Sequence, residues 1–181
     1  AADVLYREGY LWDPAEPRAA MRRAIEVARG AGRKVAFTLS DSFVIERHGD
    51  DFRTLIDAGM IDILFANEAE ITHLSGQADF DAAVAAVAGK VPMLIATRSK
   101  KGACAVHQGE RVDVPAEPID HVVDTTGAGD LFAAGVLTGL AQDRSIADSL
   151  TMGAVCARAI IAQVGPRAQV DLKQLVAERL A

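Results

Sequence analysis

Residues 124–143 read DTTGAGDLFAAGVLTGLAQD, a glycine-containing turn that opens into an apolar helical pattern. Gly127 and Gly129 lie between two carboxylates, Asp124 and Asp130. The first backbone N–H groups of a helix have no partner within the helix, and the positive end of the helix dipole lies behind them. Such a helix start binds phosphate oxygens. The sequence therefore predicts an anion site at this turn, next to a carboxylate that would repel the anion.

The carboxylate of Asp130 has two explanations. It can simply favour the helix start, while the glycines only form a turn. Alternatively, it can take a proton from a hydroxyl group that attacks a phosphate held by the N–H groups of Ala128, Gly129 and Asp130 itself. The spacing alone leaves both explanations open.

Upstream of this turn, apolar runs of strand length alternate with helical patterns. We expect strands at 4–6, 34–38, 61–66 and 93–97, and helices at 17–30, about 40–58, 68–74 and 79–88. This alternation predicts an α/β fold with a doubly wound, mostly parallel sheet and helices on both faces, in a single domain over 1–181. Ligands of such sheets bind at the carboxyl ends of the strands. The loops at Asn67, Thr97 and Asp124 are therefore the candidate site.

Beyond residue 97 the pattern changes twice. Short apolar runs at 103–107, 111–114 and 121–123, separated by glycine and proline, predict antiparallel strands. Helical patterns then cover 127–142, 145–164 and 171–180. No linker or repeat divides these segments.

Composition excludes several classes of protein. The net charge of -6 argues against a nucleic-acid binder. No apolar run reaches the length of about 18 residues that a membrane span needs, so we expect a cytoplasmic protein. The two cysteines and four histidines show no metal-ligand spacing. A dinucleotide fingerprint is also unsupported, because Phe132 stands where its third glycine belongs.

The turn at 124–130, opening a long helix, resembles the signature of the ribokinase-type, or PfkB, carbohydrate kinase family. Three further stretches agree with that family in order and spacing. They are FANEAE at 65–70 (an NxxE motif), ATRSKKGA at 96–103 (a T-x-G-x-x-G nucleotide loop with Ser99 in place of glycine) and VGPR at 164–167 (a Gly-Ala turn). Within the family, the stretches 8–13, 39–43 and 67–71 are most similar to bacterial adenosine-kinase-like members.

The resemblance implies a role for each matching residue, with ATP and Mg²⁺ as cofactors. Asp130 is the implied catalytic base, and Gly127, Ala128 and Gly129 form the implied anion hole. Asn67 and Glu70 would organise Mg²⁺ through water. The implied nucleotide contacts are Thr97, Arg98, Gly102 and Thr126. Asp124 would bind a monovalent cation such as K⁺.

Each implied role has a simpler alternative. Glu70 and Asp124 can cap a helix and a turn, and Arg98 can be a solvated surface residue. Trp12 can contact a base or pack in the core. Asp41 and Ser42, which follow a strand, can face the acceptor or cap the next helix.

The resemblance covers only the C-terminal part of the family's fold, because no stretch matches the N-terminal Gly-Gly motif or the β lid. We expect a fragment of a longer protein, weakly active by itself, whose exposed strand edges favour a homodimer. The expected function is ATP-dependent phosphorylation of an alcohol group of a nucleoside or sugar, with adenosine as the leading acceptor. The alternatives are a ribokinase-like or fructokinase-like sugar kinase and a nucleotide-binding module without catalysis.

Overall fold

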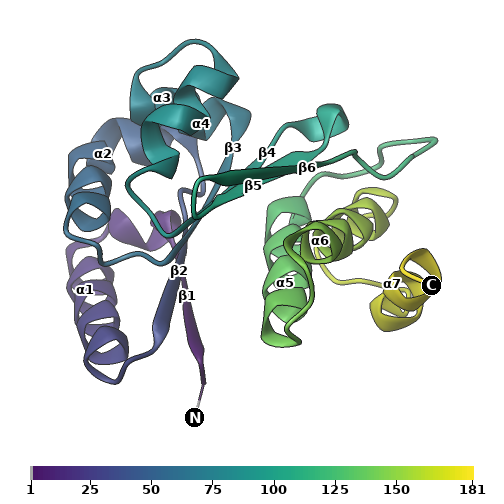
Figure 1. Ribbon diagram of the computed structural model, residues 1–181, viewed down its shortest axis with the longest axis horizontal. Coiled ribbons are helices and arrows are strands. Elements are labelled where there is room, and N and C mark those ends of the chain that lie inside the picture. Colours follow the sequence, from purple (N-terminus) through teal and green to yellow (C-terminus); the bar gives the residue numbers. More distant parts are fainter. Residues whose placement is uncertain (1) are drawn as a thin grey trace. The chain divides into compact units, whose positions relative to one another are not determined.

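A computed structural model describes residues 2–181 of the chain (Figure 1). The chain forms two compact units. The first comprises Ala1–Thr97 and Val106–Arg111, and the second comprises Arg98–Ala105 and Val112–Ala181. Six strands form one sheet in the order β1-β2-β3-β4-β5-β6. The α/β fold with a mostly parallel sheet that the alternation predicts is confirmed.

The first unit is a regular series of strands and helices. Its elements are β1 (Val4–Glu8), η1 (Gly9–Trp12), α1 (Ala15–Gly30), β2 (Lys34–Thr38), α2 (Ser42–Asp57), β3 (Ile63–Asn67), α3 (Glu68–Ser75), α4 (Phe80–Ala88) and β4 (Met93–Thr97). Each neighbouring pair from β1 to β4 is parallel. Because parallel neighbours need right-handed crossovers, helices that join consecutive strands lie on one face. Figure 1 shows α1 and α2 on the same side of β1 and β2.

Aromatic packing joins these helices to the sheet. Trp12, Phe37 and Phe52 are fully buried and meet edge to face, with ring centroids 5.1–5.7 Å apart. The indole Nε1 of Trp12 donates to Asp51 Oδ2 at 2.9 Å, so its one polar atom is satisfied. Trp12 is therefore a core residue, and not an exposed contact for a base.

Side-chain caps fix where the helices begin. Asp41 Oδ1 accepts from the backbone N–H of Phe43, as expected for the cap residue of α2. Asn67 and Asp79 cap α3 and α4 in the same way. Since α2 and α3 start directly after β2 and β3, the caps place polar side chains at the carboxyl edge of the sheet.

The second unit combines a strand pair with three helices. Its elements are η2 (Ser99–Lys101), most of β5 (Ala103–His107) and β6 (Glu110–Val114), α5 (Ala128–Ala141), α6 (Ile146–Ile161) and α7 (Leu172–Arg179). Gln108 and Gly109, both with positive φ, form the two-residue turn between β5 and β6. This turn confirms the expected antiparallel pair.

Glycines allow α5 and α6 to approach closely. A Cβ atom on Gly135 would lie 2.7 Å from Met152 O, and one on Gly139 would lie 2.6 Å from Ser149 Oγ. A Cβ on Gly153 of α6 would lie 2.7 Å from a methyl group of Val136. Any side chain at these positions would push the two helices apart, so the glycines set the position of α5 against α6.

The predicted strand at 121–123 is wrong. These residues form no strand, and Val122 and Val123 are 63% and 53% exposed. The backbone N–H of Val123 donates instead to the carbonyl of Ile161 at the end of α6, at 2.9 Å. The segment is tied to a helix end and joins no sheet.

Within residues 2–181, no helix is both long enough and apolar enough to cross a membrane.

Candidate active site

The turn before α5 leaves two backbone donors unused. Gly127 adopts the left-handed conformation, with φ of 79°, and its carbonyl accepts from the N–H of Leu131 at 2.9 Å. The N–H of Ala128 donates to the carbonyl of Thr125 at 3.1 Å, so it closes the turn. Across residues 2–181, the N–H groups of Gly129 and Asp130 donate no hydrogen bond to a backbone carbonyl. The turn therefore offers two free donors to an anion, where the sequence predicted three.

Asp130 is the third residue of α5, next to these donors. It is exposed, and within the described chain no hydrogen bond or ion pair engages its carboxylate. A carboxylate that served only to stabilise the turn would be expected to accept a bond from it, as Asp41 does at the start of α2. The Asp130 side chain is thus available to an incoming hydroxyl group.

Asp124 ties the start of this turn to the segment that follows α6. Its Oδ1 accepts from the backbone N–H of Thr126 and its Oδ2 accepts from that of Gly165, both at 2.9 Å. Hydrogen bonds from the Thr126 side chain and backbone, and from Gly165, hold the pKa of Asp124 below its usual range. Asp124 therefore links the turn before α5 to the segment after α6, and of the predicted site residues it is bonded to Thr126.

The loop after β4 is closed by its own backbone. The N–H of Arg98 donates to the carbonyl of Gly102 at 2.7 Å, and the N–H of Gly102 donates to that of Ser99 at 3.0 Å. Gly102 has φ of 94° and ψ of -147°, which is a glycine conformation. Ser99 has φ of 51°, consistent with a position where glycine is usual.

Asn67 and Thr97 lie side by side at the carboxyl ends of β3 and β4, where they are direct register partners. Asn67 caps α3 through a reciprocal pair of bonds with Glu70. Asn67 Oδ1 accepts from Glu70 N at 2.9 Å, and Glu70 Oε2 accepts from Asn67 N at 3.0 Å. Asn67 Nδ2 also donates to Glu70 Oε1 at 2.6 Å. The two residues predicted to act together are therefore joined by three hydrogen bonds.

Glu70 is a buried carboxyl group, with only 5% of its surface exposed. Burial raises its pKa from 4.5 to about 7, although the bond from the backbone of Asn67 opposes this shift. The neighbouring charge of Asp41 raises the pKa further. Near neutral pH the group is therefore close to the midpoint of its titration.

The raised pKa of Glu70 predicts a specific loss of stability at higher pH. Well below pH 4.5 the group is neutral in both the folded and the unfolded chain, and it carries no penalty. As the pH rises towards 7 the unfolded chain ionises first, so the folded state loses stability, on the order of 3 kcal/mol. Urea unfolding of Glu70→Gln at pH 5 and pH 8, without Mg²⁺, should show a smaller fall in stability than the unsubstituted protein.

Glu68→Gln, one position from the cap of the same helix, is the matched control and should retain the unsubstituted pH dependence. If Glu70→Gln and the unsubstituted protein lose equal stability between the two pH values, the carboxyl of Glu70 titrates normally.

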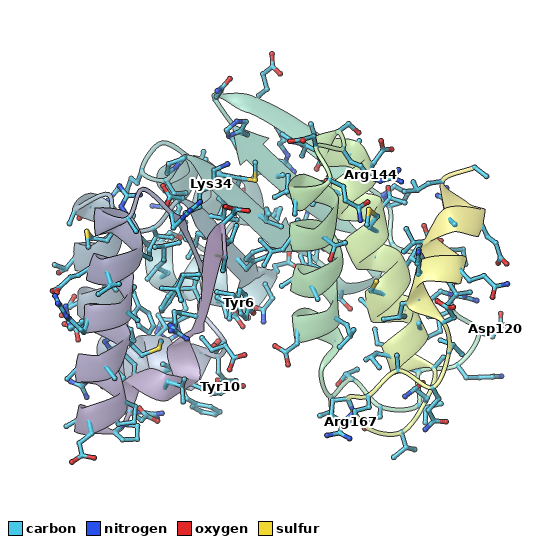
Figure 2. All side chains as sticks on the ribbon, turned by 90° about the horizontal axis from the view of Figure 1, so that it is seen from below. Tyr6, Tyr10, Lys34, Asp120, Arg144 and Arg167 are labelled. Atoms are coloured by element: carbon cyan, nitrogen blue, oxygen red, sulfur yellow. The ribbon has the colours of Figure 1, made fainter. Side chains whose placement is uncertain are left out.

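An aromatic surface at the carboxyl ends of β1 and β2 was not predicted from the sequence. Tyr10 and Leu11 of η1 are 55% and 45% exposed, and Phe43 in the first turn of α2 is 67% exposed. Asp41 is bonded to both aromatic residues: its Oδ2 accepts from the Tyr10 hydroxyl at 3.5 Å, and its Oδ1 accepts from the backbone N–H of Phe43 at 2.8 Å. Figure 2 labels Tyr10 on the short helix after β1. The only sequence signal was the position of these residues directly after two strands.

The arrangement of these motifs agrees with a known family. The sequence pattern of the pfkB family carbohydrate kinases matches residues 1–173. The chain belongs to the pfkB family. The resemblance drawn from the turn at 124–130 is therefore confirmed.

Similar pfkB-type proteins include kinases of sugars and of adenosine. A fructokinase from Klebsiella pneumoniae is 33% identical over 141 residues, which make up 75% of this chain and 45% of the fructokinase. The structure of a probable sugar kinase from Rhizobium etli CFN 42 is 40% identical, with a TM-score of 0.96 over 98% of this chain and 54% of the other. The adenosine kinase from Sinorhizobium meliloti is 42% identical, with a TM-score of 0.94 over 99% of this chain and 54% of the other. The chain thus spans about half the length of these relatives.

The pfkB motifs contain side-chain oxygens that could bind a metal ion. Within residues 2–181 no group of three or more His, Cys, Asp or Glu side chains is placed to hold a metal ion. Each oxygen of Glu70 accepts one hydrogen bond and keeps a further lone pair, which fits contact with a metal-bound water. The oxygens of Asp124 likewise accept one backbone bond each. These side chains therefore suit a metal held jointly with substrate phosphates or water.

Proposed function

We propose that the full-length protein is an ATP-dependent phosphotransferase acting on an alcohol group of a nucleoside, with adenosine as the leading acceptor. Membership of the pfkB family supports the reaction class. The observation that carries the mechanism is the unpaired carboxylate of Asp130 beside the free N–H groups of Gly129 and Asp130. A module that only bound nucleotide would gain from a carboxylate at this place only its interaction with the helix dipole, and the carboxylate would repel the bound phosphate.

In the proposed reaction, the Asp130 carboxylate accepts the proton of the acceptor hydroxyl. The acceptor oxygen forms a bond to the γ-phosphorus of ATP, the bond from that phosphorus to the bridging oxygen breaks, and ADP leaves. The two N–H groups stabilise negative charge on the transferring phosphoryl group. A positioned base of this kind contributes about 10²–10⁴-fold to the rate.

Three loops supply the proposed nucleotide and cation contacts. Thr97, Arg98 and Gly102 belong to the loop after β4, whose closed backbone offers a fixed surface to the nucleotide. Asn67 and Glu70 would hold Mg²⁺ through water, and bound Mg²⁺ would neutralise phosphate charge. Asp124 is ionised and exposed enough to contribute to a monovalent cation site as well as to fasten the turn.

The aromatic surface favours a nucleoside over a simple sugar. Tyr10 and Phe43 present ring surface at the sheet edge where ligands of such folds bind. A nucleobase stacks on an aromatic side chain with about 1–3 kcal/mol per base, whereas a sugar without a base has no π-face to stack. The adenosine kinase among the similar structures is consistent with this preference. A sugar kinase is the second candidate, supported by the fructokinase similarity.

A panel of acceptors tests the choice between these candidates. The full-length protein, given ATP and Mg²⁺, should phosphorylate adenosine with a higher kcat/KM than ribose or fructose. Phe43→Ala should raise the KM for adenosine about fivefold or more, because the lost stacking is worth roughly 1 kcal/mol or more. Its effect on the KM of any sugar substrate should be within about twofold.

Val27→Ala is the control, because Val27 is also an exposed apolar residue, at 55%, but lies on α1. It should leave every KM unchanged. Turnover of sugars without turnover of nucleosides would overturn the nucleoside proposal and leave the sugar kinase.

A further inference from the structure

The side chain of Gln163 bridges the two ends of the turn after α6. Gln163 Nε2 donates to the carbonyl of Arg167 at 2.5 Å, and Gln163 Oε1 accepts from the N–H of Gln169 at 2.9 Å. One carboxamide thus spans residues 164–168 and uses both its donor and its acceptor. Gln163 is partly buried, whereas the residues from Pro166 to Gln169 are exposed. Figure 2 shows Arg167 in this turn.

The other fixed point of the turn is Asp124. Gly165 has φ of 85°, and its N–H donates to Asp124 Oδ2 at 2.9 Å. In the described chain, the side-chain bonds to residues 164–169 come from Asp124 and Gln163 alone. The position of the turn therefore depends on these two side chains.

Between these two fixed points, Pro166 packs directly on Gly127. A Cβ atom on Gly127 would lie 2.7 Å from Pro166 Cβ and 3.2 Å from its Cα, so only glycine leaves room for the proline. Gly127 is also the residue whose left-handed conformation starts α5 and directs the N–H groups of Gly129 and Asp130. The turn after α6 thus forms one wall of the turn that carries the anion site.

We propose that Gln163 is a positioning residue for phosphoryl transfer: it keeps residues 164–168 closed, so that Pro166 holds Gly127 and the donors behind it in place. Gln163 acts through Pro166 and touches no reacting atom. The catalytic part of this inference rests on the proposed function. The mechanical part, that Gln163 orders residues 126–131, is independent of the proposed function.

Hydrogen exchange of the full-length protein tests the mechanical part without any substrate. Gln163→Ala should speed exchange of the hydrogen-bonded amides in this segment, those of Thr126, Ala128 and Leu131, about tenfold, because the turn that packs on Gly127 is released. Gln169→Ala is the matched control: it has the same residue type in the same turn, and only its backbone N–H is used. It should leave exchange in 126–131 unchanged. Unchanged exchange in Gln163→Ala would overturn the proposal even if the protein proves to be a kinase.

Kinetics test the catalytic part. Gln163→Ala should lower kcat about tenfold, since small displacements of catalytic groups are costly, with the KM for the acceptor within about twofold. In Gln163→Glu the carboxylate still accepts from Gln169 but cannot donate to Arg167, and protonation restores the donor. The ratio of its kcat to that of the unsubstituted protein should therefore rise towards acid pH, which a general loss of stability would not cause.

A full kcat in Gln163→Ala, or a flat ratio for Gln163→Glu, would overturn the catalytic role. If the unsubstituted protein transfers no phosphoryl group while the exchange result holds, the proposed function fails and the ordering role of Gln163 stands.

Discussion

Asp130→Asn in the full-length protein is expected to lower kcat for phosphoryl transfer by about 10²-fold or more. Asparagine has nearly the same shape as aspartate but cannot accept the proton of the acceptor hydroxyl. The N–H groups of Gly129 and Asp130 belong to the backbone and are retained in the variant. The affinity for ATP should therefore stay within about threefold, and the loss should appear in kcat and not in KM.

The control for Asp130→Asn is Asp148→Asn. Asp148 is the third residue of α6, as Asp130 is the third residue of α5, so both carboxylates interact with a helix dipole in the same way. Each substitution should cost about 0.5 kcal/mol of stability on this account. Equal kcat in the two variants would mean that Asp130 only favours the start of its helix.

Gly102→Ala is expected to be the most destabilising single change in the nucleotide loop. A Cβ atom there would lie 2.0 Å from the carbonyl oxygen of Val114 and 2.9 Å from backbone atoms of Pro115. Neither neighbour can move as a flexible side chain would, and alanine also disfavours φ of 94°. We expect a loss of about 3 kcal/mol or more in the free energy of unfolding, measured by urea denaturation, with weaker ATP binding because the end of β6 and the loop separate.

Gly109→Ala is the control that separates the two causes of the stability loss, the steric clash of the new Cβ atom and the strain of a positive φ. Gly109 also has positive φ, 81°, but a Cβ atom there would meet no atom within 4 Å. Its substitution should cost about 1 kcal/mol, from strain alone. If Gly102→Ala costs no more than Gly109→Ala, the close approach of Val114 and Pro115 is not a constraint on this loop.

Local patterns in the sequence were sufficient to predict most of the fold. Hydrophobic runs and caps placed β2 and α2 within a residue or two, because burial on both faces and a capping carboxylate leave a direct trace in the residue types. Val122 and Val123 led to the wrong prediction of a strand at 121–123. A valine pair favours extended backbone whether or not another strand pairs with it, and only the position of Ile161 decided the outcome.

The candidate site was predictable where one short segment carries the chemistry. The position of Asp130 at a helix start made it a candidate, and the resemblance of 65–70 and 124–130 to the pfkB family, carried by short segments, implied the roles of Asp130, Asn67 and Glu70. Two features depended on residues far apart in the sequence. Trp12 proved to be a core residue while Tyr10 proved to be exposed, and this depended on how Phe37 and Phe52 pack. Gln163 carries no local signal, since the role proposed for it depends on the contact of Pro166 with Gly127.

The central claim is that Asp130 accepts a proton during phosphoryl transfer, and a single-turnover experiment tests it most directly. Rapid quenching of the full-length protein with saturating ATP, Mg²⁺ and adenosine measures the chemical step apart from binding and product release. The account predicts that Asp130→Asn forms phosphorylated nucleoside at least about 10²-fold more slowly than the unsubstituted protein. An equal single-turnover rate in the two proteins would contradict it.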